Sequence, residues 1–523
     1  MINGVSYERV PGRLVAAESE YLEKMVDLYS NHYGVWSPKG VRPGEKIKLS
    51  SEKMKKWLEN ENVTVYYAEL EDETIIGYAI ALSKDEKKYG HITWVTQLVV
   101  HKNHRKKGIA ERLLFSIWGF SDHYAWGIVS ANPYAIRALE KATRRRAKTI
   151  RIKKNSRKLM NVGRQNVPFI HDDTELKVNS LQSVINTQFY VDHSETLKML
   201  DDVISDDLPW ELGYIEEGWE WFAFTFKDQP QIKLSKEEIM LMIETADEVV
   251  KKAYERMAIG GKTTAQKWAN NTTAEIDYLS QKIGFENITR VYDLGCGSGR
   301  HSIELAKRGM NVTGIDYIPV NVEKAKKAIS SIRTTGKYDL NNIEIEVKDC
   351  RSYTNSQKAN LVICLYDVVG SFASDEDNIK IIKTAYDLLS PNGFAVFSVM
   401  NYVTTVNSAK HKFVFDEDPN ILLDLLPSSI METSGNIYNP DYYCVDTKTH
   451  LVYRKERFVG GNDLPVELIV RDRRFTKEEI TGLCKKIGFS IVEAKYTNAS
   501  GWEYEYDADC KRAKEILIIC KKP

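Results

Sequence analysis

The sequence of 523 residues lacks several features that would assign it at once to a broad class of protein. It has no run approaching the ~20 consecutive apolar residues that a membrane-spanning helix needs. Its first residues lack the basic-then-apolar pattern of a secretory signal, so we expect a soluble cytoplasmic protein. Neither charge is in excess, since 73 Lys and Arg residues balance 73 Asp and Glu residues. A dedicated nucleic-acid-binding protein would normally carry a basic excess, which makes that class the weaker expectation.

Cysteine is scarce as well. The seven cysteines are scattered and odd in number, and no two form a C-x-x-C pair. A disulfide framework or a zinc cluster would need closer and more regular spacing, so we predict reduced thiols and no metal site. Hydrophobic residues, by contrast, make up 43% of the chain, which is ample for packed cores. Because one core cannot serve a chain of this length, we expect roughly two to four domains.

Short strand-like and helical runs alternate through residues 1–165. Two β-rich segments meet at a polar turn and predict a hairpin, and a third strand precedes a helix that begins near Ile109. Antiparallel strands followed by a strand–helix–strand–helix unit are an α+β arrangement. Two later aromatic segments are interpreted as strands that finish this domain. The predicted strands are 63–73, 74–83, 90–100, 126–131, 185–195 and 218–226.

From residue 290 onward, apolar strands alternate with helical patterns. Such continuous apolar runs indicate a parallel sheet that is buried on both faces. We therefore predict an α/β multidomain chain with a second sheet that is mostly parallel and seven-stranded. A capping box at Ser235 and Glu238 predicts a helix start just after the linker. The predicted strands are 291–295, 311–316, 343–349, 361–367, 394–400, 490–496 and 515–522. The predicted domains are 1–230 and 236–523, with a linker over 231–235 and an insertion over 401–475.

A glycine-rich turn follows the first strand of the second domain, in the segment VYDLGCGSGRHS over 291–302. Glycines there let the backbone turn sharply and approach a ligand closely. Asp316 ends the next strand, where its carboxylate can accept hydrogen bonds from both ribose hydroxyls of a nucleoside. Asp349 ends the third strand, where it can hold an adenine amino group. A dinucleotide-binding G-x-G-x-x-G motif is excluded, because Arg300 stands where its third glycine would be.

These features resemble the class I S-adenosylmethionine (SAM)-dependent methyltransferases, from roughly Tyr254 to Pro523. The D-L-G-C-G-S-G turn, the two strand-terminal aspartates and the segment LLSPNGFAVFS all match that superfamily's pattern. The resemblance implies a Rossmann-like fold and SAM as the cofactor. The residues that it assigns to SAM binding are Asp293, Gly295, Cys296, Gly297, Asp316, Tyr317, Asp349, Cys350 and Leu365.

Methyl transfer needs an in-line nucleophile and accurate positioning. The segment LYDVVG closes the fourth strand, so Tyr366 and Asp367 are predicted to face the transferred methyl group as catalytic residues. Asp367 would orient or deprotonate an amine or a hydroxyl, and the alternative is that it only caps the following loop. His301 is interpreted as a helix-start residue rather than a base. The insertion over 401–475 is expected to shape the acceptor pocket.

The second informative segment is QLVVHKNHRKKGIAERLL over 97–114, which reads as an apolar strand, a polar turn and an amphipathic helix. Successive backbone N–H groups at a helix N-terminus can cradle a pyrophosphate, and Gly108 permits its close approach. The basic side chains of the turn add charge complementarity for a polyphosphate.

This segment resembles motif A of the GNAT acetyltransferase superfamily, Arg/Gln-x-x-Gly-x-Gly/Ala, and the helix over 131–143 resembles the family's second motif. The resemblance implies acetyl-CoA as a cofactor, with its pantetheine amides paired to the splayed strand end. Leu139 stands where the second motif commonly carries a Tyr general acid. Either another group protonates the leaving thiolate, or the domain acts slowly, or it binds acyl-CoA without transfer. The residues assigned to acetyl-CoA are Leu98, Val99, Val100, Arg105, Lys106, Lys107, Gly108, Ile109, Ala110 and Asn132.

The basic run RRRAKTIRIKKNSRK over 144–158 is consistent with a solvated strand edge, or with contact to the 3′-phosphate of CoA or an anionic acceptor. Our leading hypothesis is a bifunctional enzyme, an acetyl-CoA-dependent N-acetyltransferase and a SAM-dependent methyltransferase acting on a small amine-bearing metabolite. The alternatives are a modifier of RNA or protein, and a methyltransferase regulated by a non-catalytic acyl-CoA-binding domain. Net neutrality favours a small-molecule acceptor over nucleic acid, and no membrane partner is expected.

Overall fold

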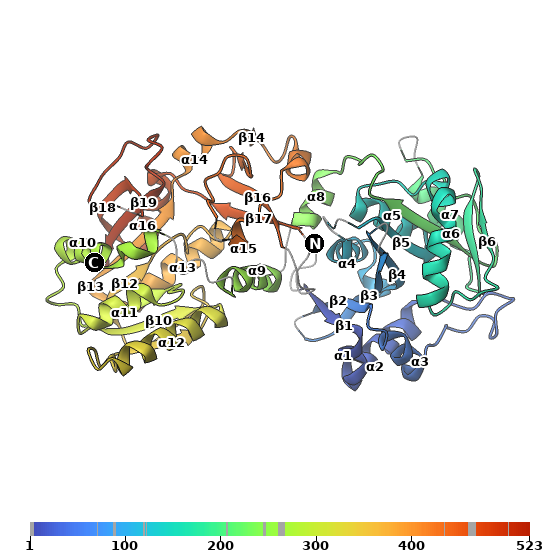
Figure 1. Ribbon diagram of the computed structural model, residues 1–523, viewed down its shortest axis with the longest axis horizontal. Coiled ribbons are helices and arrows are strands. Elements are labelled where there is room, and N and C mark those ends of the chain that lie inside the picture. The colour runs from blue at the N-terminus through green and yellow to red at the C-terminus, as the bar shows by residue number, and fades with distance from the viewer. Residues whose placement is uncertain are drawn as a thin grey trace. The chain divides into compact units, whose positions relative to one another are not determined.

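The computed structural model describes residues 5–70, 72–86, 90–118, 121, 123–204, 208–243, 247–259, 267–433, 435–458, 467–499 and 501–523. Two compact units divide the chain, and in sequence the division falls between residues 243 and 247 (Figure 1). Within the described ranges, no helix has the length and apolarity to cross a membrane. All seven cysteines are free thiols, and six of them are buried.

The first unit is built on one eight-stranded sheet in the order β1-β2-β3-β4-β5-β8-β7-β6. All paired neighbours run antiparallel except β4 and β5, which run parallel. This confirms the predicted α+β arrangement. The strands are β1 (Val5–Pro11), β2 (Val63–Leu70), β3 (Ile75–Glu86), β4 (Gly90–Val100), β5 (Ala125–Ser130), β6 (Leu176–Val178), β7 (Ser183–Phe189) and β8 (Gly218–Phe226). The helices are α1 (Gly12–Ala17), α2 (Ser19–His32), α3 (Ser51–Leu58), α4 (Ile109–Trp118), α5 (Pro133–Thr143), α6 (Thr149–Asn166), α7 (Thr196–Val203) and α8 (Lys236–Ile243).

Strands β4 and β5 separate part of the way along their length. Their paired positions run from Ile92 to Val95 on β4 and go no further, although β4 continues to Val100. Leu98 to Val100 still pair with β3 on the other side. The end of β4 is therefore splayed away from β5, as the resemblance to the GNAT superfamily implied.

The basic run after α5 is helical, so the interpretation as a strand edge is wrong. Residues 149–158 belong to α6, whose buried side chains include Ile152, Asn155, Leu159 and Val162. These positions recur every three to four residues, which is the helical period and places the lysines and arginines between them toward solvent. A run of charges hid this apolar stripe in the sequence.

The predicted capping box at the start of α8 is present. The Ser235 N–H donates to Oε2 of Glu238 at 2.8 Å, and the Glu238 N–H donates to Oγ of Ser235 at 3.3 Å. These two bonds satisfy donors that a helix start leaves without intrahelical partners. Helix α8 lies after the expected linker over 231–235 and groups with the first unit.

The second unit is built on a seven-stranded sheet in the order β11-β10-β9-β12-β13-β19-β18. Its first five strands are parallel, and β19 is antiparallel to both of its neighbours. The mostly parallel, seven-stranded sheet is thus confirmed. The strands are β9 (Arg290–Leu294), β10 (Asn311–Asp316), β11 (Ile343–Val347), β12 (Ala359–Cys364), β13 (Leu389–Met400), β18 (Ser490–Thr497) and β19 (Glu515–Lys521). The helices are α9 (Asp247–Ile259), α10 (Thr272–Ile283), α11 (Arg300–Lys307), α12 (Pro319–Thr334), α13 (Asp375–Leu388), α14 (Tyr402–Ser408), α15 (Ile430–Thr433) and α16 (Lys477–Ile487).

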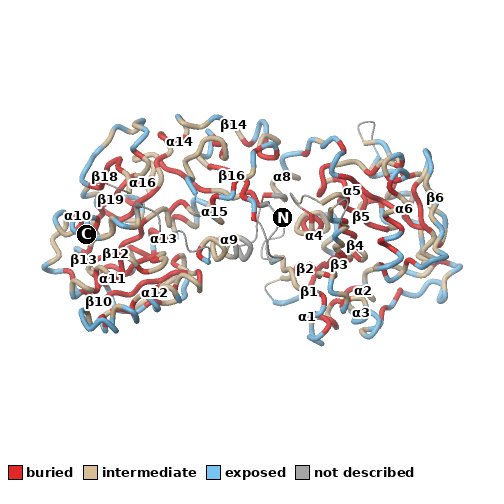
Figure 2. Tube along the Cα trace, viewed as in Figure 1, coloured by how far each residue is buried: buried red, intermediate tan, exposed pale blue. Residues whose placement is uncertain are grey.

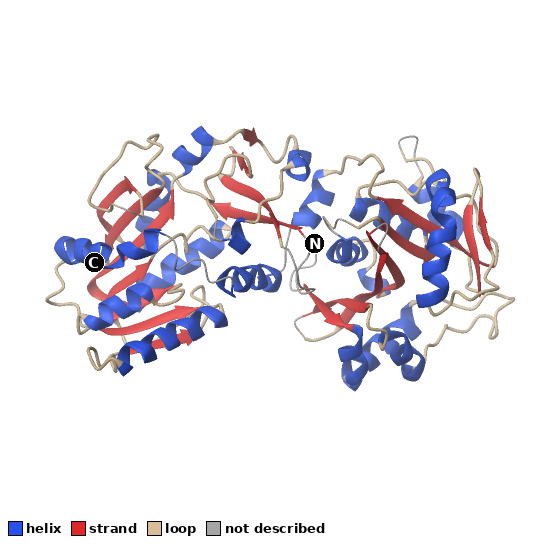
Figure 3. Ribbon diagram, viewed as in Figure 1, coloured by secondary structure: helices blue, strands red, loops and turns tan. Residues whose placement is uncertain are grey.

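Both faces of this sheet are covered by helices (Figure 3). On β9, Val291 packs into a core shared with α11 and α12, whereas the next residue, Tyr292, packs into a core shared with α13 and α16. Successive side chains of a strand point to opposite faces, so a strand buried on both sides must be apolar throughout. Figure 2 shows the resulting buried strands beneath more exposed helices.

The insertion within 401–475 forms a separate four-stranded sheet in the order β14-β15-β16-β17. Its neighbours β15 and β16 pair antiparallel. Its strands are β14 (His411–Phe413), β15 (Tyr443–Asp446), β16 (Leu451–Arg457) and β17 (Glu467–Arg473).

Candidate functional site

The glycine-rich turn of the second unit joins β9 to α11. The N–H groups of Gly295 and Cys296 both donate to the Ile315 carbonyl, at 2.8 and 2.9 Å, which ties the turn to the end of β10. Gly295 has a φ of +72°, and a Cβ there would lie 2.4 Å from Cγ2 of Val368. Glycine alone combines this backbone conformation with such a close approach. The turn therefore lies directly against the loop that follows β12.

Asp316 closes this turn from the end of β10. Its Oδ2 accepts the Gly297 N–H at 2.8 Å, and its Oδ1 accepts the Ile318 N–H at 2.8 Å. The carboxylate is buried, and burial raises its pKa. Oδ1 also accepts a longer bond from Nδ2 of Asn321 at 3.4 Å, whereas Oδ2 keeps a further lone pair that a ribose hydroxyl could use. Tyr317 follows at the strand end, beside the predicted nucleoside position.

Asp293, also assigned to SAM binding, lies beneath the turn. Its Oδ2 accepts a hydrogen bond from Oγ of Ser302 at 2.6 Å, and burial raises its pKa. This bond fastens the first turn of α11 to the end of β9. In the structure Asp293 therefore holds the shape of the turn.

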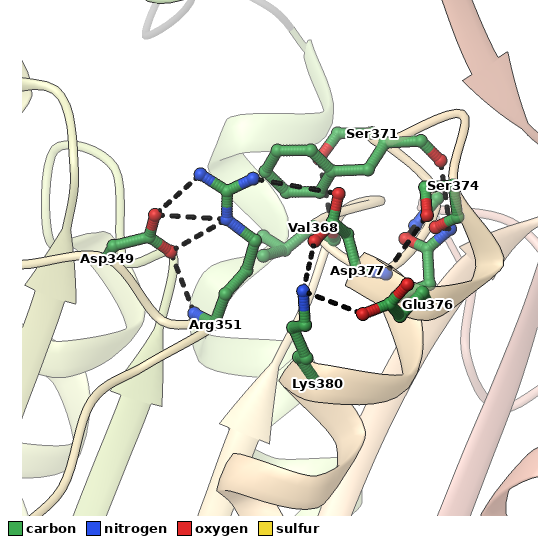
Figure 4. Close-up of polar contacts among 11 residues, drawn as sticks. Asp349, Arg351, Val368, Ser371, Ser374, Glu376, Asp377 and Lys380 are labelled. Atoms are coloured by element: carbon green, nitrogen blue, oxygen red, sulfur yellow. Dashed lines mark hydrogen bonds and ion pairs between the residues drawn. The ribbon is translucent and has the colours of Figure 1, made fainter. Parts of the chain in front are cut away.

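Asp349 lies after β11 and is bound by a neighbouring arginine (Figure 4). Nη2 of Arg351 donates to Oδ2 of Asp349 at 2.7 Å, and the Arg351 backbone N–H donates to Oδ1 at 2.8 Å. Nη1 of the same arginine lies 3.8 Å from a carboxylate oxygen of Asp377 on α13. Although burial opposes it, Arg351 lowers the pKa of Asp349, which therefore stays ionised. Cys350, the next residue, is a buried thiol whose pKa burial raises to about 12.

The predicted catalytic residues lie in a strained turn directly after β12. Leu365 is buried, and the next two residues, Tyr366 and Asp367, have φ values of +61° and +65°. Left-handed backbone costs a non-glycine residue about 1–3 kcal/mol and persists only where the surroundings enforce it. Here β13 enforces it, because Ser398 accepts the Tyr366 N–H at its Oγ (2.6 Å) and the Asp367 N–H at its carbonyl (3.2 Å).

Asp367 is partly buried behind this turn. Its Oδ1 accepts the Met400 N–H at 3.3 Å. Burial and the nearby Asp472 raise its pKa well above the ordinary carboxyl value. Burial and a like charge both disfavour the ionised form of a carboxyl group, so Asp367 takes up a proton more readily than an exposed aspartate does.

Sequence reasoning missed the group that holds Tyr366. The Tyr366 hydroxyl donates to Oε1 of Glu275 on α10, and Nε2 of His301 lies 2.7 Å from Oε2 of the same carboxylate. Although burial opposes it, the contacts with His301 and Arg300 lower the pKa of Glu275. His301 is indeed near the start of α11, as expected, but it is buried and hydrogen-bonded. In the sequence, a glutamate at an apolar core position of α10 could have indicated that Glu275 has buried polar partners.

Glu515, at the start of β19, gives this region a pH dependence of stability. Burial and the neighbouring Glu275 carboxylate raise its pKa to about 8. The folded state therefore keeps a proton that the unfolded state releases near pH 4.3. Stability from this group is complete below that value and is lost as pH rises to about 8. We expect the unfolding free energy of the second unit to fall by on the order of 2 kcal/mol between pH 5 and 8.

Replacing Glu515 by Gln should remove this dependence, because glutamine does not titrate. Urea denaturation of the full chain at several pH values measures it, with wild type and Glu515→Gln compared at each pH. Parallel curves for the two proteins would contradict the assignment.

In the first unit, the predicted phosphate-binding turn joins β4 to α4. Arg105 folds back over the turn, because its Nε donates to the Val100 carbonyl at 3.1 Å and its Nη2 donates to the His32 carbonyl. Lys106 has a φ of +58°, and its Nζ lies 5.2 Å from the ring centre of Tyr134. Lys107 is exposed, and Ile109 and Ala110 form the first turn of α4.

Gly108 ends this turn and is in contact with α8. Its φ is +82°, and a Cβ there would lie 3.2 Å from Cδ2 of Leu241. Nη1 of Arg112, one turn into α4, donates to the Leu241 carbonyl. No local pattern in the sequence indicates this contact, which joins residues 129 positions apart.

The helix of the predicted second motif, α5, begins at Asn132. Its side chain accepts the Tyr134 N–H at 2.9 Å and so caps the helix. The hydroxyl of Tyr134 donates to Oδ2 of Asp202 at 2.8 Å. Leu139 is completely buried, so no hydroxyl reaches the site from that position.

A buried glutamate lies in the otherwise aromatic strand β8. Oε2 of Glu220 accepts a hydrogen bond from Oγ1 of Thr187 at 2.9 Å, and burial raises the pKa of Glu220 to about 7. Burial, with a contribution from the Glu220 carboxylate, also raises the pKa of Tyr29 and Tyr33 on and after α2. Glu220 is the only charged residue in the segment GWEWFAFTF, and this could have indicated a buried carboxyl group from the sequence.

The two turns fit the cofactors that the sequence implies, SAM at Gly295 and acetyl-CoA at Gly108. At Gly295 the Val368 side chain fills the space that a Cβ would need, and Oδ2 of Asp316 retains a lone pair. At Gly108 the left-handed backbone opens a helix start whose first N–H groups have no intrahelical partners.

Comparisons with known families match the two regions of the chain that contain these turns. Residues 23–143 match a family model described as the acetyltransferase (GNAT) family, and residues 291–393 match one described as a methyltransferase domain. The chain therefore carries a GNAT-family acetyltransferase domain in its first unit and a methyltransferase domain in its second.

Curated relatives match the methyltransferase part. A ubiquinone biosynthesis O-methyltransferase of Actinobacillus pleuropneumoniae is 31% identical over 126 residues, which are 24% of this chain and 52% of that protein. A putative methyltransferase, YqeM of Bacillus subtilis, is 26% identical over 221 residues, or 40% of this chain and 77% of that protein. The chain thus spans about half the length of the ubiquinone-biosynthesis relatives it matches.

Among solved structures, the CcbJ methyltransferase from Streptomyces caelestis is similar over 48% of this chain and 89% of its own. The TM-score is 0.36 at 14% sequence identity, a likeness too distant to support a functional conclusion.

Proposed function

We propose that the chain is a bifunctional enzyme, an acetyl-CoA-dependent N-acetyltransferase and a SAM-dependent methyltransferase acting on a small amine-bearing metabolite. The methyltransferase half of the proposal is supported by one observation, the contact between two turns of the second unit. The glycine-rich turn closed by Asp316 lies against the loop of Tyr366 and Asp367, through Gly295 and Val368. A nucleoside-binding turn beside a buried, strained polar turn is what methyl transfer to a positioned acceptor requires.

In this proposal SAM, when bound, supplies an electrophilic methyl group on a sulfonium. The chain's own residues bind the cofactor and orient the acceptor. Asp316 holds the ribose, Tyr366 is fixed by Glu275, and Asp367 hydrogen-bonds the acceptor close to its nucleophilic atom. Burial of these groups excludes water and strengthens each electrostatic contact.

The acetyltransferase half rests on the splayed end of β4 and the turn at Gly108. Extended backbone at Leu98 to Val100 can pair with the amides of pantetheine, and the helix start can hold the pyrophosphate. Glu220 is a candidate general base for an amine acceptor in this proposal, because burial raises its pKa to about 7, near the working pH.

The two cofactors should bind independently, since their turns belong to different units. Asp316→Ala should weaken SAM binding by about 2–3 kcal/mol, from the loss of charge-assisted hydrogen bonds, and leave acetyl-CoA affinity unchanged. Titration calorimetry with each cofactor on the full chain measures both. Loss of both affinities from this one substitution would overturn the assignment of two separate sites.

A second candidate function follows from the contact between Leu241 and Gly108. A side chain packed against the turn, together with the absence of a hydroxyl at Leu139, favours a domain that binds acyl-CoA and regulates the methyltransferase without transferring the acyl group. CoA release distinguishes the two functions, because only a transferase produces it.

A further inference from the structure

Arg474 lies just after β17 and has a completely buried side chain. Its Nη1 donates to Oγ1 of Thr405 at 2.7 Å. The guanidinium carbon lies 4.9 Å from the ring centre of Tyr438 and 5.7 Å from that of Tyr443. Both rings are themselves fixed, since their hydroxyls donate to the carbonyls of Lys514 (2.7 Å) and Thr405 (3.0 Å). The guanidinium is therefore held in one orientation.

One edge of this guanidinium has no partner. Nε and Nη2 of Arg474 make no hydrogen bond to any described residue, and no described carboxylate lies within ion-pair distance. These two nitrogens form the side edge of the planar group, whose parallel N–H bonds match the two oxygens of a carboxylate. An arginine keeps its charge in a protein, and a buried charge without a partner is strongly unfavourable. The edge is thus complementary to an anion that the chain does not supply.

Neighbouring arginines do not share this property. Arg454 on β16 pairs with Asp472 and, at 3.1 Å, with Glu456. Arg473, adjacent to Arg474, pairs with Asp375 at 3.0 Å and with Glu479 at 2.7 Å. The sequence supplies carboxylates for both of these buried arginines, so the lack of one at Arg474 is specific to that position.

The segment that carries Arg474 is hydrogen-bonded to residues around the predicted catalytic turn. The Arg473 N–H donates to the Gly370 carbonyl at 2.7 Å, and the Phe475 N–H donates to the Met400 carbonyl at 3.1 Å. Gly370 and Met400 both contact the Asp367 carboxyl group. The residues on either side of Arg474 are therefore joined to the surroundings of Asp367.

We propose that Arg474 binds a carboxylate group of the methyl acceptor, so that the acceptor is a small molecule carrying both a carboxylate and the nucleophile. This assignment rests on the proposed methyltransferase function. A carboxylate is favoured over a phosphate because the edge offers one pair of donors and one positive charge. The carboxylates of Asp472 and Glu456, which pair with Arg454, already add negative charge in this region, which disfavours a dianion.

The test does not require the acceptor to be known. The full chain with ¹⁵N-labelled arginine, saturated with S-adenosylhomocysteine, is titrated with acetate and benzoate, and with acetamide and benzamide as neutral partners of the same shape. We expect the Nε–H resonance of Arg474, assigned by its loss in Arg474→Lys, to shift with the carboxylates. Calorimetric affinity should be at least about 10-fold higher for each carboxylate than for its amide. Equal affinities, or tighter binding of methyl phosphate, would overturn the proposal.

Two variants complete the test. Arg474→Met should abolish the preference for carboxylates, whereas Arg471→Met, which removes a half-buried arginine from the preceding strand β17, should leave it intact. Thermal unfolding and S-adenosylhomocysteine titration check that each variant folds. If Arg474→Met does not fold, the comparison of carboxylates with amides on the wild-type protein still tests the proposal. Failure of wild type to bind S-adenosylhomocysteine would refute the methyltransferase function instead, which keeps the two failures distinguishable.

Discussion

Replacing Gly108 by tryptophan is expected to reduce CoA release from acetyl-CoA to below detection and to lower acetyl-CoA affinity at least about 100-fold. The substitution has two effects. Tryptophan is strained at a φ of +82°, by about 1–2 kcal/mol, and its side chain would enter space that Leu241 already fills. The indole would also cover the helix start at Ile109, where the pyrophosphate is proposed to lie. Affinity for S-adenosylhomocysteine should not change, because that site belongs to the other unit.

Gly44→Trp is the matched control. Gly44 lies in an exposed loop of the same unit with a φ of +80°, and a Cβ at this position would have no atom within 4 Å. It carries the same backbone strain without the crowding. CoA release is followed over a panel of amines, with acetyl-CoA binding measured by calorimetry. If Gly108→Trp retains acetyl transfer, the pyrophosphate is not held at this turn. If wild type binds acetyl-CoA tightly and releases no CoA with any amine, the regulatory function replaces catalysis.

Gly295→Val is expected to lower the affinity for SAM at least about 100-fold and to stop methyl transfer. A β-branched residue at a φ of +72° is strained, and its Cβ would lie 2.4 Å from Cγ2 of Val368. Relief of that clash must move either the turn or the loop that carries Asp367. Both movements damage the site, because the turn positions the nucleoside and the loop positions the acceptor.

Gly309→Val separates strain from crowding in this unit. Gly309 follows α11 with a φ of +89°, and no atom lies within 4 Å of a Cβ placed there. This variant should lose about 1–2 kcal/mol of stability and keep its affinity for S-adenosylhomocysteine. The measurements are calorimetric titration with that ligand and thermal unfolding of each variant. Equal losses of affinity in the two variants would show that backbone strain, rather than contact with Val368, controls the site.

Local signals in the sequence were sufficient for the fold class, for most of the strands and for the position of the two glycine-containing turns. Apolar runs predicted every strand of the second sheet: central strands such as β9 and β12 are apolar because both faces are buried, whereas the edge strands β11 and β18 alternate. The glycines of each turn and the acid at Asp316 were likewise visible, since their spacing along the chain sets their geometry. The one wrong interpretation, at α6, arose where charges concealed a stripe including Ile152 and Leu159.

Contacts between distant segments could not be predicted in this way. The hydrogen bond from Tyr366 to Glu275 joins residues 91 positions apart, and the bond from Arg474 to Thr405 joins residues 69 apart. Pairings of this kind depend on how the elements pack, which no local pattern specifies. The role of Arg474 depends further on the partner that it lacks, and this could be recognised only after its surroundings had been described.

Tyr366 and Asp367 both have left-handed backbone, which lowers the stability of the fold at the turn proposed to serve methyl transfer. Glycine at Tyr366 would lose the hydrogen bond to Glu275, but at Asp367 it would relieve backbone strain of about 1–3 kcal/mol and remove a polar side chain from the proposed surroundings of the acceptor. Random mutagenesis scored only for heat resistance should therefore enrich glycine here and yield robust proteins with little methylating capacity. Directed evolution of this chain would need a selection for turnover to preserve the turn.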